Sequence, residues 1–242
     1  IRKQAGQLLH VSNLFHIESQ SLLAAELTRL SFADKVFFCN SGTEANEGAI
    51  KLARRYFFDK GDKNRHEIIT MNNSFHGRTT GSLSATGQKK FHTGFGPLLP
   101  GFKYVAFNDI PAVQKALSSK TCAVLVEPVQ GEGGVNIPDK KYLKELRKLS
   151  TKNGCLLILD EVQTAFGRTG PLFAYERFGI KPDIMTLAKA LGAGVAIGAL
   201  AATNRVMKSF VPGTHAATFG GNPLACSAAL AALEIYTKPG FL

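Results

Sequence analysis

Residues 155–161 read CLLILDE, a run of apolar residues that ends in two acids. A run this short and this apolar is typical of a strand buried on both faces of a parallel sheet. Because strand-length apolar runs alternate with amphipathic helical stretches along the chain, we expect an α/β fold built on a mostly parallel, mixed sheet with helices on both faces. The other runs of strand length are 36–39, 67–70, 122–127, 184–188 and 198–203.

Three segments outside these runs have the spacing of helices. We expect helices over 41–58, 140–152 and 223–236. The first begins with Ser41-x-x-Glu44, the pattern of a capping box. Its buried stripe would consist of Ala45, Ala49, Leu52 and Tyr56.

The composition excludes several classes of protein. With 45% hydrophobic and 19% charged residues among 242, the chain resembles an ordinary globular protein. Its longest uncharged apolar stretch, 191–203, is shorter than the roughly 20 residues that span a bilayer. The first residues contain no apolar signal-peptide core, so we expect no membrane partner. The four cysteines form no C-x-x-C pair, which predicts reduced thiols and a cytoplasmic protein, or a mitochondrial matrix protein in a eukaryote.

The formal net charge of +11 raises the question of nucleic-acid binding. Basic residues gather at 54–65 and 140–152, but both stretches also contain acids and have helical periodicity. Solvated helix faces explain them better than a phosphate-backbone footprint, so we expect no nucleic-acid partner. The histidines and cysteines lack zinc-ligand spacing, and no metal site is expected.

Three predicted strands end in a functional polar group, namely Glu127, Asp160 and Lys189. Carboxyl ends of parallel strands meet at one edge of a sheet, so the three side chains should project to the same side. Lys189 carries the single charge of MTLAKALGAG, residues 185–194, a setting suited to a desolvated amine nucleophile. Burial among Leu187, Ala188 and Leu191 would lower the pKa of this lysine.

Two glycine-containing junctions could bind phosphate. In NSGTEAN, residues 40–46, the amides of Gly42 and Thr43 and the positive end of the following helix would form a cradle. A capped turn explains this motif equally well. Thr218 precedes two glycines and a helix start, an arrangement suited to a second phosphate contact.

Residues 73–82 combine a flat ring with a cation. Phe75 could stack on a planar ligand and Arg78 could bind a carboxylate through two hydrogen bonds, whereas His76 is better explained as a loop histidine. Asp160 could cap local structure, bind a metal or pair with a cationic heteroatom, and in isolation the first explanation is slightly favoured.

The order of the motifs along the chain is more specific than any single motif. The chain resembles the class III aminotransferases, which use pyridoxal 5′-phosphate (PLP), over essentially its whole length. Within the class it is most similar to the acetylornithine and succinyldiaminopimelate type, with the ornithine and 4-aminobutyrate aminotransferases as near relatives. The resemblance is carried by SGTEANE, FHGRT, GFGP, VEPVQGEGG, DEVQTAFGRTG, LAKALGAG and TFGGNPLAC, which occur here in the order of the family.

The resemblance implies a role for each residue around the cofactor. Lys189 matches the lysine that forms a Schiff base with PLP and then moves the proton, and Asp160 matches the partner of the pyridine nitrogen. Gln163 matches the contact to the 3′-oxygen of the cofactor. Phe75, or less favourably its neighbour His76, matches the residue that covers the ring.

Other matches concern phosphate and substrate. Thr218 matches a phosphate contact that the second subunit of a homodimer supplies, and Arg78 matches the arginine that binds a substrate carboxylate. Glu132 matches the acid that gates a second arginine, so that one pocket accepts both the amino donor and 2-oxoglutarate. Glu127 would lie behind these residues. The phosphate cradle would consist of Ser41, Gly42 and Thr43.

The resemblance therefore implies the large domain of PLP-dependent transferase fold type I over residues 1–242, without the N-terminal segment and the small C-terminal domain of the family. The implied reaction transfers the terminal amino group of N-acetylornithine to 2-oxoglutarate, giving glutamate, as in arginine biosynthesis. Ornithine, 4-aminobutyrate and succinyldiaminopimelate remain alternative donors, and a non-catalytic PLP-binding fragment is the alternative outside enzymes.

Overall fold

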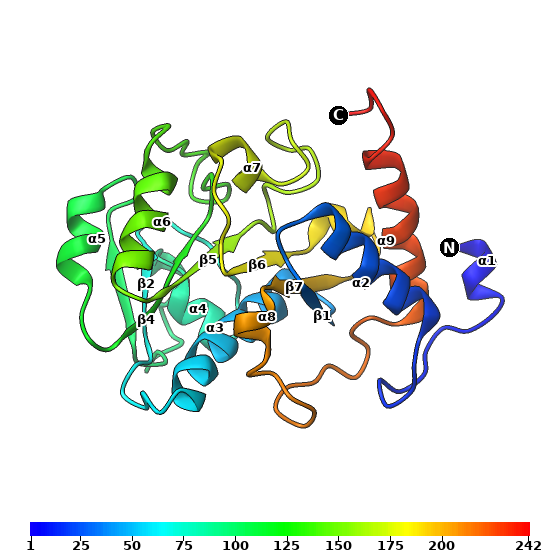
Figure 1. Cartoon of the computed structure of the whole chain (residues 1–242), viewed down its shortest axis with the longest axis horizontal. Helices are drawn as coiled ribbons and strands as arrows, with labels where there is room; N and C mark the ends of the chain where they lie inside the picture. Colours follow the sequence, from blue (N-terminus) through cyan, green and yellow to red (C-terminus); the bar gives the residue numbers. More distant parts are fainter.

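Seven strands form one sheet in the order β1-β7-β6-β5-β4-β2-β3 in the computed structural model, which describes residues 1–242 (Figure 1). Strand β7 runs antiparallel to both of its neighbours, and all other pairs are parallel, which confirms the predicted mixed and mostly parallel sheet. The strands are β1 (Lys35–Cys39), β2 (Glu67–Met71), β3 (Phe102–Val105), β4 (Thr121–Val126), β5 (Leu156–Asp160), β6 (Ile184–Leu187) and β7 (Gly198–Ala202).

The predicted runs all became strands, and one strand, β3, was missed. It lies at the edge of the sheet, where only Val105 of its four residues is buried. An edge strand that is largely accessible to solvent needs no continuous apolar run. The search for such runs, which finds the inner strands, therefore does not detect it.

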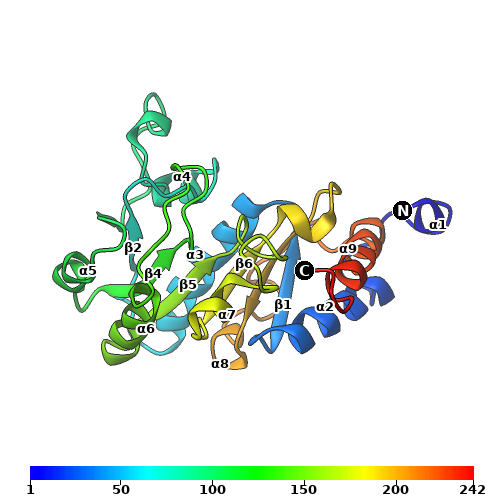
Figure 2. The same cartoon turned by 90° about the horizontal axis from the view of Figure 1, so that it is seen from above.

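Helices cover both faces of the sheet, as predicted. Figures 1 and 2 show α5 and α6 together at one end of the sheet and α2 and α9 at the other. The predicted helices correspond to α3, α6 and α9. The helices are α1 (Arg2–Ala5), α2 (Glu18–Leu30), α3 (Gly42–Asp59), α4 (Thr80–Ala85), α5 (Ile110–Ala116), α6 (Tyr142–Lys152), α7 (Ala174–Phe178), α8 (Asn204–Met207) and α9 (Pro223–Tyr236), with the 3₁₀ turns η1 (Lys89–Phe91) and η2 (Lys189–Gly192).

Alternate residues of the central strands belong to two separate hydrophobic cores, one on each face of the sheet. In β5, Leu157 and Leu159 pack on the side of α2, α6 and α9, while Leu156 and Ile158 pack on the side of α3. Successive side chains of a strand point to opposite faces, so a strand buried on both faces must be apolar at every position. This explains why the uninterrupted apolar run 155–159 predicts a strand inside the sheet, with helices on both faces.

The start of α3 differs in one detail from a capping box. Ser41 Oγ accepts a hydrogen bond from the backbone N–H of Glu44 at 3.3 Å. The Glu44 carboxylate, however, accepts from the backbone N–H of Asn40 and not from that of Ser41. The first-turn amides of Gly42 and Thr43 have no hydrogen-bond partner within the chain. They lie just beyond the carboxyl end of β1.

Two further expectations can be compared with the structure. All four cysteines are buried and none lies in a disulfide. None of the helices combines the length and the apolar character required to span a bilayer.

Candidate functional site

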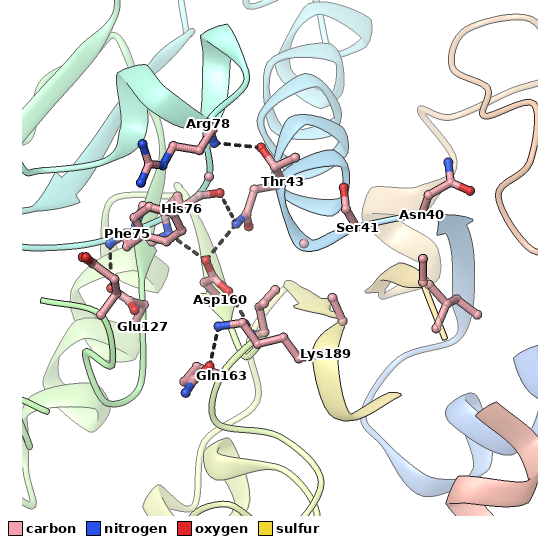
Figure 3. Close-up of a pocket in the computed structure, with 18 of the residues that line it drawn as sticks. Asn40, Ser41, Thr43, Phe75, His76, Arg78, Glu127, Asp160, Gln163 and Lys189 are labelled. Carbon is pink, nitrogen blue, oxygen red and sulfur yellow. Dashed lines mark hydrogen bonds and ion pairs between the residues drawn. The ribbon is translucent and has the colours of Figure 1, made fainter. Parts of the chain in front are cut away.

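The polar groups at the ends of three strands meet, as predicted, around one cavity of about 460 Å³ (Figure 3). Glu127 follows β4, Asp160 ends β5, and Lys189 follows β6. The N-terminus of α3 forms another wall of the same cavity. The site therefore lies beyond the carboxyl ends of parallel strands, the usual position of ligand sites in α/β sheets.

Asp160 is buried and held by three hydrogen bonds. Its Oδ2 lies 2.7 Å from His76 Nδ1 and accepts from Asn46 Nδ2 at 2.8 Å, and its Oδ1 accepts from the backbone N–H of Val162 at 3.0 Å. Because a carboxylate faces His76 Nδ1, we assign the proton to that nitrogen. The His76 side chain is thus turned toward Asp160, which leaves the Phe75 ring as the flat surface of this loop in the cavity (Figure 3).

Asn46 is a site residue that the sequence analysis missed. Its side chain donates to Asp160 and to the backbone carbonyl of His76 at 2.8 Å, and it accepts from Thr186 Oγ1 at 2.9 Å. A detectable signal existed, because Asn46 falls on the buried side of an amphipathic helix and buried amides need hydrogen-bond partners.

Glu127 supports the loop that carries Phe75. Its carboxylate accepts from the backbone N–H of Phe75 at 3.1 Å and from that of Gly131 at 3.4 Å. Burial raises the pKa of the Glu127 carboxyl above its ordinary value, His76 opposes this effect, and the nearby Asp160 carboxylate adds to it. Glu127 therefore lines the cavity, where it was expected to lie behind the other residues, and its carboxylate holds two of the cavity's loops together.

Lys189 differs from the expectation in its burial. The side chain is exposed to the cavity, and its Nζ donates a hydrogen bond to Gln163 Oε1 (Figure 3). The prediction that apolar neighbours bury the amine is wrong, because the neighbouring apolar side chains point into the core instead. The backbone of Lys189 has a φ of +47°, in the left-handed region. The buried neighbours are Leu187, Ala188 and Leu191.

The proposed phosphate cradle depends on two close backbone approaches. A Cβ at Gly42 would lie 2.8 Å from Val162 Cγ1. Gly77 has a φ of +135°, and a Cβ there would lie 2.9 Å from Ser82 Cβ. Neither position tolerates a larger residue without displacement of its neighbours.

The hydroxyl groups of the cradle have different tasks. Thr43 Oγ1 accepts from the backbone N–H groups of Arg78 at 3.2 Å and Thr79 at 3.3 Å, so it joins α3 to the loop. Ser41 Oγ accepts from Glu44, which leaves its own hydrogen available for donation. Available donors at this wall of the cavity are therefore the amides of Gly42 and Thr43 and the hydroxyl of Ser41.

Arg78 supplies a cation without an acidic partner. Its guanidinium lies 4.2 Å from the centre of the Phe91 ring and 5.6 Å from that of the Phe75 ring, and it makes no ion pair in this chain. Stacking on aromatic rings orients such a group while its donors stay free. The guanidinium thus lines the cavity as an open site for an anion.

Of the two remaining predicted residues, one lines the cavity and the other does not. Glu132 lines the cavity, where its partners are Gln88 and Lys90 and not an arginine. Thr218 lies outside the cavity, exposed on the loop between α8 and α9, beside a separate hollow of about 400 Å³.

The comparison with protein families agrees with this fold. The model of the aminotransferase class III family matches residues 1–242, and the chain belongs to this family. It is 57% identical to the acetylornithine aminotransferase of Caldanaerobacter subterraneus subsp. tengcongensis, over 100% of this chain and 61% of that protein. It is 54% identical to the acetylornithine aminotransferase of Methanocaldococcus jannaschii, over 97% of this chain and 59% of that protein. The chain therefore spans about three fifths of the length of these relatives.

Solved structures show the same fold. The ornithine aminotransferase from Toxoplasma gondii ME49 superposes with a TM-score of 0.94 at 37% identity, over 97% of this chain and 57% of that one. A thermostable (S)-enantioselective omega-transaminase from Thermomicrobium roseum gives a TM-score of 0.91 at 35% identity, over 97% and 59%. The fold is that of the PLP-dependent aminotransferases.

Proposed function

We propose that residues 1–242 form the PLP-binding large domain of an aminotransferase that moves the terminal amino group of N-acetylornithine to 2-oxoglutarate. The observation that carries this proposal is the position of Lys189 and Asp160 at the ends of adjacent strands in one cavity, beside the open N-terminus of α3. An amine, a fixed carboxylate and a phosphate cradle are the groups that PLP requires.

The donor set of the cavity fits the parts of PLP one by one. The free amides of Gly42 and Thr43 and the hydroxyl of Ser41 are suited to the phosphate. Asp160 would pair with the protonated pyridine nitrogen, and the Phe75 ring would cover the ring of the cofactor. A cavity of about 460 Å³ lies within the range of small-molecule sites.

The residues of the chain would divide the work as follows. PLP, when bound, supplies an electron sink for the substrate carbon. His76 and Asn46 hold Asp160 in one orientation, so that its negative charge stays directed at the position of the ring nitrogen. Lys189 would hold the cofactor through its amine and afterwards carry the proton between the two reacting carbons, and Gln163 orients that amine.

The substrate assignment rests on the site and on the relatives together. Arg78 presents an unpaired guanidinium, which suits a substrate carboxylate. N-acetylornithine and glutamate both carry such a group, and the acetylornithine aminotransferases are 50% to 57% identical to this chain. The superposition on ornithine aminotransferase keeps ornithine as the second candidate donor, at lower identity.

The assembly and compartment are also part of the proposal. Thr218 does not line the cavity of its own chain, which fits a role at the cofactor of a second copy in a homodimer. Four buried, unpaired thiols fit a reducing compartment, and we propose the cytoplasm.

Trapping of the cofactor tests the proposal. The chain is mixed with PLP, its visible absorption is recorded, and borohydride reduction is followed by peptide mass mapping. We expect a pyridoxyl group on the peptide that contains Lys189, and none on that peptide in Lys189→Ala. Label scattered over surface lysines would contradict the assignment of the site. Specific label without amino transfer from any of the candidate donors would support a PLP-binding fragment instead of an enzyme.

A further inference from the structure

Tyr236, the last residue of α9, connects that helix to the turn that carries Lys189. Helix α9 packs beside η2 (Figure 1), and the Tyr236 hydroxyl donates a hydrogen bond to the backbone carbonyl of Ala190 at 2.9 Å. Ala190 follows Lys189 directly in η2. Its carbonyl also accepts from the backbone N–H of Ala193 at 3.2 Å. One of the two bonds therefore closes the turn from within, and the other fixes it to a helix outside.

The backbone around η2 is strained on both sides of this carbonyl. Lys189 has a φ of +47° and Ala193 has a φ of +48°, both in the left-handed region that disfavours a residue with a Cβ. Backbone strain of this kind persists only where surrounding contacts hold it in place. The hydrogen bond from Tyr236 is such a contact, and it acts on the residue next to the lysine of the site.

The ring of Tyr236 contacts the other segment that positions the amine. Its centre lies 5.8 Å from the centre of the Phe166 ring. Phe166 is buried, and it lies three residues beyond Gln163, which accepts the hydrogen bond of Lys189 Nζ. Tyr236 therefore contacts both segments whose side chains meet at the amine. Its hydroxyl binds η2, and its ring packs against the loop that follows β5.

We propose that Tyr236 is a positioning residue for Lys189, because it holds η2 and the loop after β5 in the arrangement in which the amine reaches the aldehyde carbon of PLP. Tyr236 does not line the cavity, so it acts through Ala190 and Phe166. The inference rests on the proposed function. It adds to the site a residue from α9, a helix that contributes no side chain to the cavity.

The test compares two ligands of the whole chain by calorimetry. The Lys189 amine and the PLP aldehyde join as an imine with loss of water, whereas pyridoxine 5′-phosphate has the same ring and phosphate but no aldehyde. Tyr236→Phe keeps the ring and removes the hydroxyl, and the Ala190 carbonyl keeps the N–H of Ala193, so the fold should persist.

The variant should weaken binding of PLP and not of the analogue. Without the hydroxyl, η2 occupies the competent arrangement for a smaller fraction of the time, and the apparent Kd of PLP rises by the same factor. We expect a rise of about fivefold, the effect of one neutral hydrogen bond. The Kd of pyridoxine 5′-phosphate should not change, because this ligand does not use the amine. Tyr104→Phe is the matched control and should change neither Kd, because the Tyr104 hydroxyl donates to the carbonyl of Ser84 at 2.6 Å, outside the cavity.

A second mutation separates positioning of the amine from a purely structural role. In a Lys189→Ala background, Tyr236→Phe should no longer change the Kd of PLP, because the amine that it positions is gone. An unchanged Kd of PLP in Tyr236→Phe, an equal loss for both ligands, or a loss that persists in Lys189→Ala would overturn the inference and leave the proposed function intact. If the unaltered chain takes no specific borohydride label at Lys189 and binds PLP no more tightly than pyridoxine 5′-phosphate, both are overturned.

Discussion

The backbone of Lys189 allows its chemical and structural roles to be separated. Its φ of +47° lies in the left-handed region, which costs a residue with a Cβ about 1–2 kcal/mol. Lysine and alanine both bear this cost, whereas glycine does not. Lys189→Ala and Lys189→Gly both remove the amine, so they should differ only in stability.

The expected difference follows from two opposing quantities. Glycine avoids the cost of about 1–2 kcal/mol but loses about 0.5–1 kcal/mol more conformational free energy on folding than alanine. Lys189→Gly should therefore be more stable than Lys189→Ala by about 0.5–1 kcal/mol. For a chain of 242 residues this corresponds to a rise in Tm of about 2 °C.

Urea denaturation and thermal melting of the cofactor-free variants measure this difference directly. Ala193→Gly is the matched control, because Ala193 also has a left-handed φ of +48° but carries no amine. It should gain a similar increment relative to the unaltered chain and keep the borohydride label on Lys189. If Lys189→Gly proves less stable than Lys189→Ala, the argument that this lysine is held in a strained backbone is refuted.

Three further predictions concern the cradle, the anion site and a buried acid. Gly42→Ala, whose Cβ would lie 2.8 Å from Val162, should cost about 1–3 kcal/mol of stability and weaken PLP binding, whereas Gly6→Ala, with only ordinary contacts, should do neither in the same melting and titration assays. Arg78→Ala should weaken binding of carboxylate substrates about 10- to 100-fold without loss of the label on Lys189, and equal affinities in calorimetry would contradict its role. Burial raises the pKa of Glu161 from 4.5 to about 7, so the folded state binds this proton more tightly than the unfolded chain, and stability should fall by about 3 kcal/mol between pH 4.5 and 7. In Glu161→Gln that contribution should be absent, and a curve of unfolding free energy against pH as steep as that of the unaltered chain would disprove it.

The sequence predicted the position of site residues best where a charged residue stands at the end of an apolar run. Glu127, Asp160 and Lys189 each end an apolar run, and their convergence follows from the direction of parallel strands. Asn46 and Phe91 were missed because each acts through a residue far away in the chain, Asn46 on Asp160 and Phe91 on Arg78. The burial of Lys189 was predicted wrongly because apolar neighbours in sequence point to the core and not toward its amine.

What the sequence by itself determined is the set of elements and the edge of the sheet at which chemistry occurs. Successive side chains of a strand point to opposite faces of the sheet. An uninterrupted apolar run therefore specifies a strand that is buried on both faces. Only the tertiary structure decided which groups are engaged and which are free. Asp160 is held by three donors, Glu132 is paired with Lys90, and Arg78 has no acidic partner. These states depend on contacts between residues distant in sequence, and hydrogen bonds and ion pairs form only at short range in space, so chain spacing does not reveal them.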